Sequence, residues 1–192
     1  MSTRGFVGFR WGGKDYRTKV RYDAYPESLG ATTVELIQDA IQENALDDWR
    51  KKVDSLVLVD YDTPPTQADR VKLDEHRATL NVENPPSDDD DSWYDLLWYT
   101  QGRVDRILDC GYLYTDLSSV MGLEYGYVVN LDDECLDFFP KGEFGDDLQQ
   151  FPFDDLPLQW LEPQDQPRDA DQRMVEAVRR WLSKAGYTNP DE

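Results

Sequence analysis

The chain has 192 residues and a formal net charge of −20, with 40 Asp and Glu against 20 Lys and Arg. Phosphate contacts depend on Lys and Arg, so this balance argues against direct binding of DNA or RNA. Hydrophobic residues make up 39% of the chain, with six Trp and eleven Tyr, and this content excludes a disordered acidic tail. No apolar run approaches the roughly 18 residues of a membrane span, and no signal peptide is evident. We therefore expect a cytoplasmic protein without membrane contact.

The N-terminus predicts a β-hairpin. The segments GFVGFRW and YRTKVRY flank GGKD, a turn sequence. Alternation places Val7, Phe9 and Trp11 on one face of the first strand. In the second strand it separates two sets of side chains: Tyr16, Thr18, Val20 and Tyr22 on one face, and Arg17, Lys19 and Arg21 on the other.

Helices are predicted to follow. Pro26 and Gly30 end the sheet, and Thr32 or Thr33 can cap one amphipathic helix that continues to Val53. The sequence LVLVD predicts a short buried strand or the end of that helix. Thr66 and Ser92 can cap two further helices, on either side of an acidic loop over 84–92, and Gly111 ends a last helical stretch.

The second half predicts another hairpin in YGYVVNLDDECLDFF, with Asp132 and Asp133 at its turn. A proline-broken arm over 151–167 and a C-terminal helix over 169–185 complete the chain. We therefore predict a single domain, 1–192, of the α+β class: an antiparallel sheet from two separated hairpins covered by helices.

The charge is distributed unevenly. Residues 1–22 carry six basic groups and one acid, whereas residues 84–166 carry 20 acids and three bases. Three stacked cations on one strand face repel each other unless carboxylates from another segment lie against them. The alternative is an anion or motif site, made by the following residues of the basic stripe and the loop after it: Arg17, Lys19, Arg21, Tyr22, Asp23 and Tyr25.

The sequence offers few groups for catalysis. His76, the only histidine, lies in a charged helix and is interpreted as solvated, and Cys110 and Cys135 are interpreted as reduced core cysteines. No phosphate-binding loop occurs, and neither a metal nor a cofactor is predicted. Ser2 could be the nucleophile of an N-terminal-nucleophile hydrolase once Met1 is removed, or only the start of a strand.

The acids and aromatic residues around position 90 form the candidate binding surface. A run of four carboxylates is followed by four aromatic side chains that could anchor a partner or equally belong to the core. These residues are Asp88, Asp89, Asp90, Asp91, Trp93, Tyr94, Trp98 and Tyr99.

The opening also resembles a group of uncharacterised proteins from tailed phages and actinobacterial genomes. The likeness rests on Thr3-Arg4-Gly5 and on an aromatic-Asp-X-Tyr-Pro motif with a following glycine, and more loosely on residues 124–139. Arg21 stands where that group has His, and Ala24 where it has Ser or Gly. The residues that match the motif are Tyr22, Asp23, Tyr25, Pro26 and Gly30. The resemblance implies a phage or mobile-element setting and no established activity.

These observations predict an accessory protein that binds a host protein with a basic surface, as a nucleic-acid mimic or a defence inhibitor. The Ser2 hydrolase is one alternative, and a virion or other structural component is another.

Overall fold

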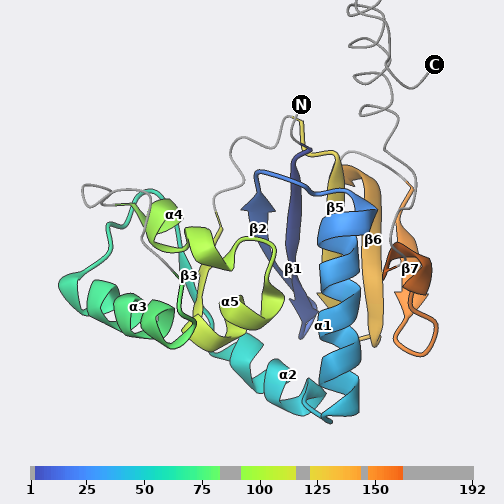
Figure 1. The fold of residues 1–192 in the computed structure, drawn as a ribbon, viewed down its shortest axis with the longest axis horizontal. Helices are drawn as coiled ribbons and strands as arrows, with labels where there is room; N and C mark the ends of the chain where they lie inside the picture. The colour runs from blue at the N-terminus through green and yellow to red at the C-terminus, as the bar shows by residue number, and fades with distance from the viewer. Residues whose placement is uncertain (1–2, 83–91, 116–121, 144–146, 162–192) are drawn as a thin grey trace, which may run out of the picture. The chain divides into compact units, whose positions relative to one another are not determined.

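Two hairpins and a fifth strand make one mixed sheet. The computed structural model describes residues 3–82, 92–115, 122–143 and 147–161. In it β1 (Gly5–Trp11) and β2 (Lys14–Val20) form the first hairpin, and β5 (Tyr125–Asn130) and β6 (Cys135–Glu143) form the second. With β7 (Gln149–Pro152) the strand order is β2-β1-β5-β6-β7 (Figure 1). The predicted α+β class is confirmed.

The prediction of a purely antiparallel sheet is wrong. The two hairpins join through β1 and β5, which run parallel, with Gly5 opposite Tyr125. The first part of the predicted proline-broken arm is also a strand, because β7 pairs antiparallel with β6. The rest of the arm contains the short helical turn η3 (Leu158–Leu161). The sheet is therefore mixed, although most of its pairings are antiparallel.

The turns of the two hairpins are bonded to each other. Gly12 and Gly13 form a two-residue loop with φ of 60° and 70°, the backbone of a tight hairpin turn that favours glycine. Both glycine N–H groups donate to the carboxylate of Asp132, each over 2.9 Å. Asp132 belongs to the β5–β6 turn, so one carboxylate fixes the ends of two hairpins together.

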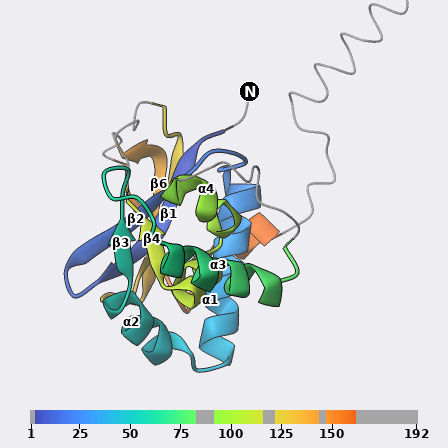
Figure 2. The ribbon, with the colours of Figure 1, turned by 90° about the vertical axis from the view of Figure 1, so that its left-hand side faces the viewer.

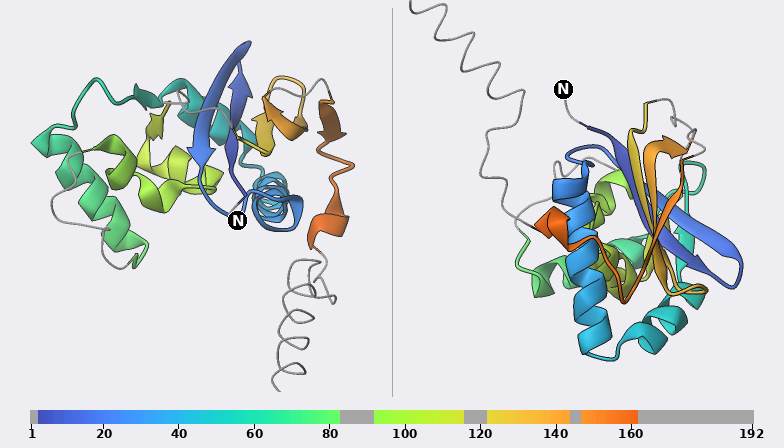
Figure 3. Two further views of the ribbon diagram at one scale, coloured as in Figure 1. Left: turned by 90° about the horizontal axis from the view of Figure 1, so that it is seen from above. Right: turned by 90° about the vertical axis from the view of Figure 1, so that its right-hand side faces the viewer.

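Helices cover one face of the sheet. Helix α1 (Ala31–Gln42) packs along it (Figure 3), against a core that includes Val7, Phe9, Tyr127 and Leu136. The predicted single helix to Val53 is wrong: Asn44 has a φ of 55°, and α2 (Leu46–Asp54) begins after this break. The predicted threonine cap is also wrong, because α1 follows a π-helical turn, η1 (Pro26–Gly30), and the Thr33 hydroxyl donates to the Leu29 carbonyl.

The two segments that carry the phage-protein resemblance meet inside this core. The Tyr127 hydroxyl donates to the carbonyl of Ala24, which is fully buried. A Cβ on Gly30 would lie 2.9 Å from the Tyr127 ring and 2.9 Å from Trp160. This close packing explains why position 30 holds glycine.

A second, smaller layer lies beyond β2. The strands β3 (Val57–Val59) and β4 (Tyr112–Tyr114) form a separate parallel pair, and β4 lies against β2 (Figure 2). Helices α3 (Gln67–Thr79) and α4 (Trp93–Leu96) belong to this part, whereas α5 (Val104–Cys110) joins the two layers, because its Cys110 packs here and its other buried side chains pack in the main core. The turn η2 (Trp98–Thr100) connects α4 to α5. The predicted caps Thr66 and Ser92 are confirmed, and so is the predicted stop at Gly111, which has a φ of 76°.

A buried polar network occupies the other face of the main sheet. The Asp137 side chain on β6 is completely buried, and it accepts hydrogen bonds from Arg10 (2.8 Å), Asn130 (3.3 Å) and Gln150 (2.8 Å). Arg10 also pairs with Asp15 at 2.7 Å. One carboxylate thus connects β1, β5, β6 and β7.

The capping carboxylate of α3 gives this layer a pH dependence. Asp69 accepts from the Thr66 hydroxyl (2.6 Å) and the Tyr112 hydroxyl (2.6 Å), and these hydrogen bonds lower the pKa of Asp69 below its ordinary value of 3.8. A pKa that is lower in the folded state adds stability that is present above about pH 4 and disappears as the pH falls through the folded value. We expect Asp69→Asn to lower the free energy of unfolding by about 1 kcal/mol at pH 7 and by less at pH 3. Urea titrations at both values measure this, and an equal loss at the two would contradict it.

All described residues belong to one compact unit, residues 1–161. Three predictions lie outside the described residues: Ser2, most of the acidic loop with Asp88 to Asp91, and the helix over 169–185.

Candidate functional site

A groove lined by three tyrosines lies where β2, β4 and α4 meet. It consists of two adjoining compartments of about 340 and 430 Å³ that share Tyr61, Ser92 and Tyr114. The proline compartment adds Asp60, Thr63, Pro64, Pro65 and Trp93, and the basic compartment adds Lys19, Arg21, Tyr94 and Asp95. We call the whole the tyrosine groove. Its volume is in the range that accommodates a small ligand or a few side chains of a partner.

Helix α4 supplies one wall of the tyrosine groove. The Ser92 hydroxyl accepts from the Asp95 N–H (3.2 Å) and also bonds the Asp95 carboxylate, which fixes the first turn. Trp93 packs inward, with its ring 5.0 Å from that of Tyr112, and Tyr94 lines the basic compartment, with its ring 5.9 Å from that of Tyr114. Trp93 therefore packs in the core, whereas the next residue, Tyr94, faces the basic compartment.

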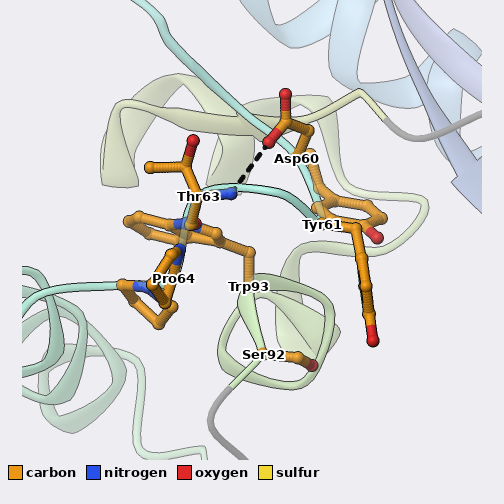
Figure 4. A pocket seen from close by; sticks show the side chains of 8 residues that line it. Asp60, Tyr61, Thr63, Pro64, Ser92 and Trp93 are labelled. Atoms are coloured by element: carbon orange, nitrogen blue, oxygen red, sulfur yellow. Dashed lines mark hydrogen bonds between the residues drawn. The ribbon is translucent and has the colours of Figure 1, made fainter.

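The loop after β3 supplies the opposite wall. The Asp60 carboxylate accepts the N–H groups of Asp62 (3.0 Å) and Thr63 (3.2 Å), and the Trp93 indole donates to the Thr63 carbonyl (2.7 Å). Figure 4 shows Trp93 beside Thr63 and Pro64, with Tyr61 on the other side of the compartment. This tight turn leaves 79% of Tyr61 exposed to solvent.

The basic stripe of β2 reaches the groove at its far end. Lys19 and Arg21 line the basic compartment, and the Arg21 guanidinium lies 4.0 Å from the centre of the Tyr94 ring, a cation–π contact. The walls here are Tyr61, Tyr94 and Tyr114, whereas the sequence suggested Tyr22 and Tyr25. Tyr22 is exposed, and the Tyr25 hydroxyl donates to Asp23 over 3.3 Å.

Arg17 has a different environment from the other two cations of the stripe. It pairs with Asp15 of its own strand at 2.5 Å, and its guanidinium lies 5.2 Å from the ring centres of Phe6 and Phe139. Arg10, a cation outside the predicted stripe, forms an ion pair with Asp137 and so connects the first hairpin to β6.

The predicted aromatic anchors are divided between core and surface. Trp93 and Tyr99 are 4% and 3% exposed, so these two side chains belong to the core and are not surface anchors. Tyr94 and Trp98 are half-buried, and Tyr94 lines the basic compartment of the groove. Sequence reasoning missed Tyr61 and Tyr114. The available signals were an aromatic residue between two aspartates before Pro-Pro, and the alternation of Tyr112 and Tyr114.

The described thiols and the histidine are poorly suited to nucleophilic chemistry. Both cysteines are free and buried, as expected; burial raises the pKa of Cys110 to about 11, and burial together with Asp137 raises the pKa of Cys135 to about 12. The interpretation of His76 as solvated is wrong: it is half-buried, its Nδ1 lies 2.8 Å from the Tyr99 hydroxyl, and burial lowers its pKa. None of the three lines the tyrosine groove.

Within the described ranges, no group of three or more His, Cys, Asp or Glu side chains is arranged to hold a metal ion. The helices of the described part include none that is long and apolar enough to span a membrane.

Comparisons with known proteins add no assignment: no family model, no curated protein and no solved structure matches the chain.

Proposed function

We propose that this protein acts by binding another protein, and that the tyrosine groove with the adjoining strand β3 is the contact surface. One observation carries the proposal. Seven large hydrophobic side chains are exposed in the described part of the chain, and three of them, Val57, Leu58 and Tyr61, lie within five residues on β3 and the loop that walls the groove. Clustered exposed apolar side chains mark interaction surfaces, and tyrosine is a frequent anchor of such contacts.

Charge supports a partner with a basic surface. The net charge of −20 attracts a cationic face and repels an acidic one, which speeds association and selects partners more than it adds affinity. The resemblance of residues 2–30 to phage proteins supports a host protein in the cytoplasm, such as a nucleic-acid-binding or defence protein, as that partner.

The proposal predicts different roles for two exposed tyrosines. Tyr61 and Tyr22 are 79% and 64% exposed, but only Tyr61 lines the groove. A photo-crosslinking amino acid at position 61 is expected to capture a basic protein in host cells, and the same group at position 22 is not. With that partner purified, Tyr61→Ala is expected to weaken the Kd by at least about tenfold and Tyr22→Ala by less than about twofold.

Two outcomes would contradict the proposal. Equal capture from positions 61 and 22 would show that the groove has no special role. A partner without a basic surface, or a Kd that does not weaken as salt rises, would remove the electrostatic argument.

A further inference from the structure

Strand β3 is an edge strand of the small parallel sheet. Among the described residues it pairs only with β4. The Val57 N–H donates to the Gly111 carbonyl (3.0 Å), and the Val59 carbonyl accepts from the Thr115 N–H (2.9 Å). Backbone groups alternate in direction along a strand, so the N–H and C=O of Leu58 point away from β4.

The side chains at this edge are apolar. Val57 is 49% exposed and Leu58 is 52% exposed, although they point to opposite faces of the pair. Exposed strand edges are usually blocked by charged side chains or proline, because an unblocked edge can pair with another chain. The edge of β3 carries neither in Val57–Val59, and its three residues limit the pairing of an added segment to the backbone groups of Leu58.

Carboxylates flank this edge along the chain. Between Lys52 and Arg70 the chain contains four aspartates, at positions 54, 60, 62 and 69, and no Lys, Arg or His. Asp54, Asp60 and Asp62 are exposed. A second copy would bring two bodies of charge −20 together, whereas an extended basic segment would be attracted.

We propose that the edge of β3 accepts a short extended segment of a partner protein as an added strand. The segment alternates apolar residues with Lys or Arg. Its backbone pairs with the N–H and C=O of Leu58, its apolar side chains contact Val57 and Leu58, and its cations lie near Asp54, Asp60 and Asp62. This inference rests on the proposed function and specifies how the partner is held, a mode in which main-chain hydrogen bonds give affinity and alternate side chains give specificity.

The experiment uses peptides selected from a random display library, about twelve residues long, against the full chain. The best peptide is synthesised, and its Kd is measured by fluorescence polarisation before and after N-methylation of each backbone nitrogen in turn. Strand addition predicts that one peptide nitrogen, the donor to the Leu58 carbonyl, is sensitive: its methylation weakens binding by about tenfold or more, and methylation of the two neighbouring nitrogens, which point away from β3, weakens binding by less than about threefold.

Variants of Leu58 test the protein side of the contact. Leu58→Pro removes the outward N–H while leaving the Val57 and Val59 bonds to β4, and Leu58→Ala keeps that N–H and shortens the side chain. We expect the proline variant to lose at least about tenfold more affinity than the alanine variant. Circular dichroism and thermal unfolding check both folds, and if the proline variant unfolds, the methylation series on the unchanged chain decides.

The contradicting outcomes separate the two proposals. Strand addition would be overturned, and the groove proposal left standing, by any of three results: no peptide nitrogen more sensitive to methylation than its neighbours, selected peptides that bind as helices, or a dimer of the chain that Leu58→Pro dissociates. Selected peptides whose binding is unaffected by both Leu58→Pro and Tyr61→Ala would overturn both.

Discussion

Replacement of Asp137 by alanine is expected to destabilise the protein by about 3 kcal/mol, one of the largest effects of any single substitution at a polar position. The carboxylate is completely buried and accepts hydrogen bonds from Arg10, Asn130 and Gln150. Without it, the buried Asn130 amide and one side of the Arg10 guanidinium lose an acceptor at a place that water reaches poorly. For a chain of this size the melting temperature should fall by roughly 6–12 °C.

The control is an exposed carboxylate in an ion pair. Asp147 is 55% exposed and pairs with Lys141, so Asp147→Ala should change the free energy of unfolding by less than about 0.5 kcal/mol. Asp137→Asn keeps an acceptor oxygen, so its loss of unfolding free energy should lie between those of Asp137→Ala and Asp147→Ala. Urea unfolding of the three variants measures these differences. A loss below about 1 kcal/mol for Asp137→Ala would mean that solvent reaches the network.

Gly126→Ala is expected to be comparably damaging, for a steric reason. A Cβ at this position would lie 2.0 Å from Cζ of Phe6, far inside the closest approach of two non-bonded carbon atoms. Phe6 is fully buried, and its ring contacts both Phe139 and the Arg17 guanidinium, so the ring has little free space to enter. We expect a loss of about 3 kcal/mol in the free energy of unfolding.

A second substitution tests this cause. Phe6→Leu shortens the opposing side chain, so the double variant Phe6→Leu/Gly126→Ala should be more stable than the sum of the two single losses predicts. Simple additivity would show that the alanine acts through the backbone of β5 and not through contact with Phe6. Both single variants and the double variant are compared by urea unfolding at one temperature.

The sequence predicted the local features of the fold better than the long-range ones. Both hairpins follow from strict alternation and recognisable turns, and the caps at Thr66 and Ser92 follow from side-chain chemistry. The parallel pairing of β1 with β5 could not be predicted, because no local pattern identifies which distant strand lies beside β1. The break at Asn44 was missed because the apolar spacing continues through it, with Ile41, Ala45 and Trp49 still on one side.

The candidate site was predicted in part for the same reason. Lys19 and Arg21 were among the expected binding residues because strand alternation places them on one face, and Tyr94 was among them because it follows the run of carboxylates. Tyr61 and Tyr114 join them only because β3 pairs with β4, and that pairing unites segments that lie far apart in the sequence. The short helix α4 has too few residues for periodicity to show which of Trp93 and Tyr94 is buried.

The central pairing of the sheet also affects how the protein can be made in a cell. During synthesis β1 leaves the ribosome long before its parallel partner β5, whose Tyr125 lies opposite Gly5. Until β5 emerges, the apolar residues of the first hairpin lack one of their two neighbouring strands. Non-local pairings of this kind slow folding and prolong the exposure of strand edges during synthesis. We therefore expect the nascent chain to expose apolar surface that chaperones can bind during that interval, and its net negative charge favours solubility until the sheet closes.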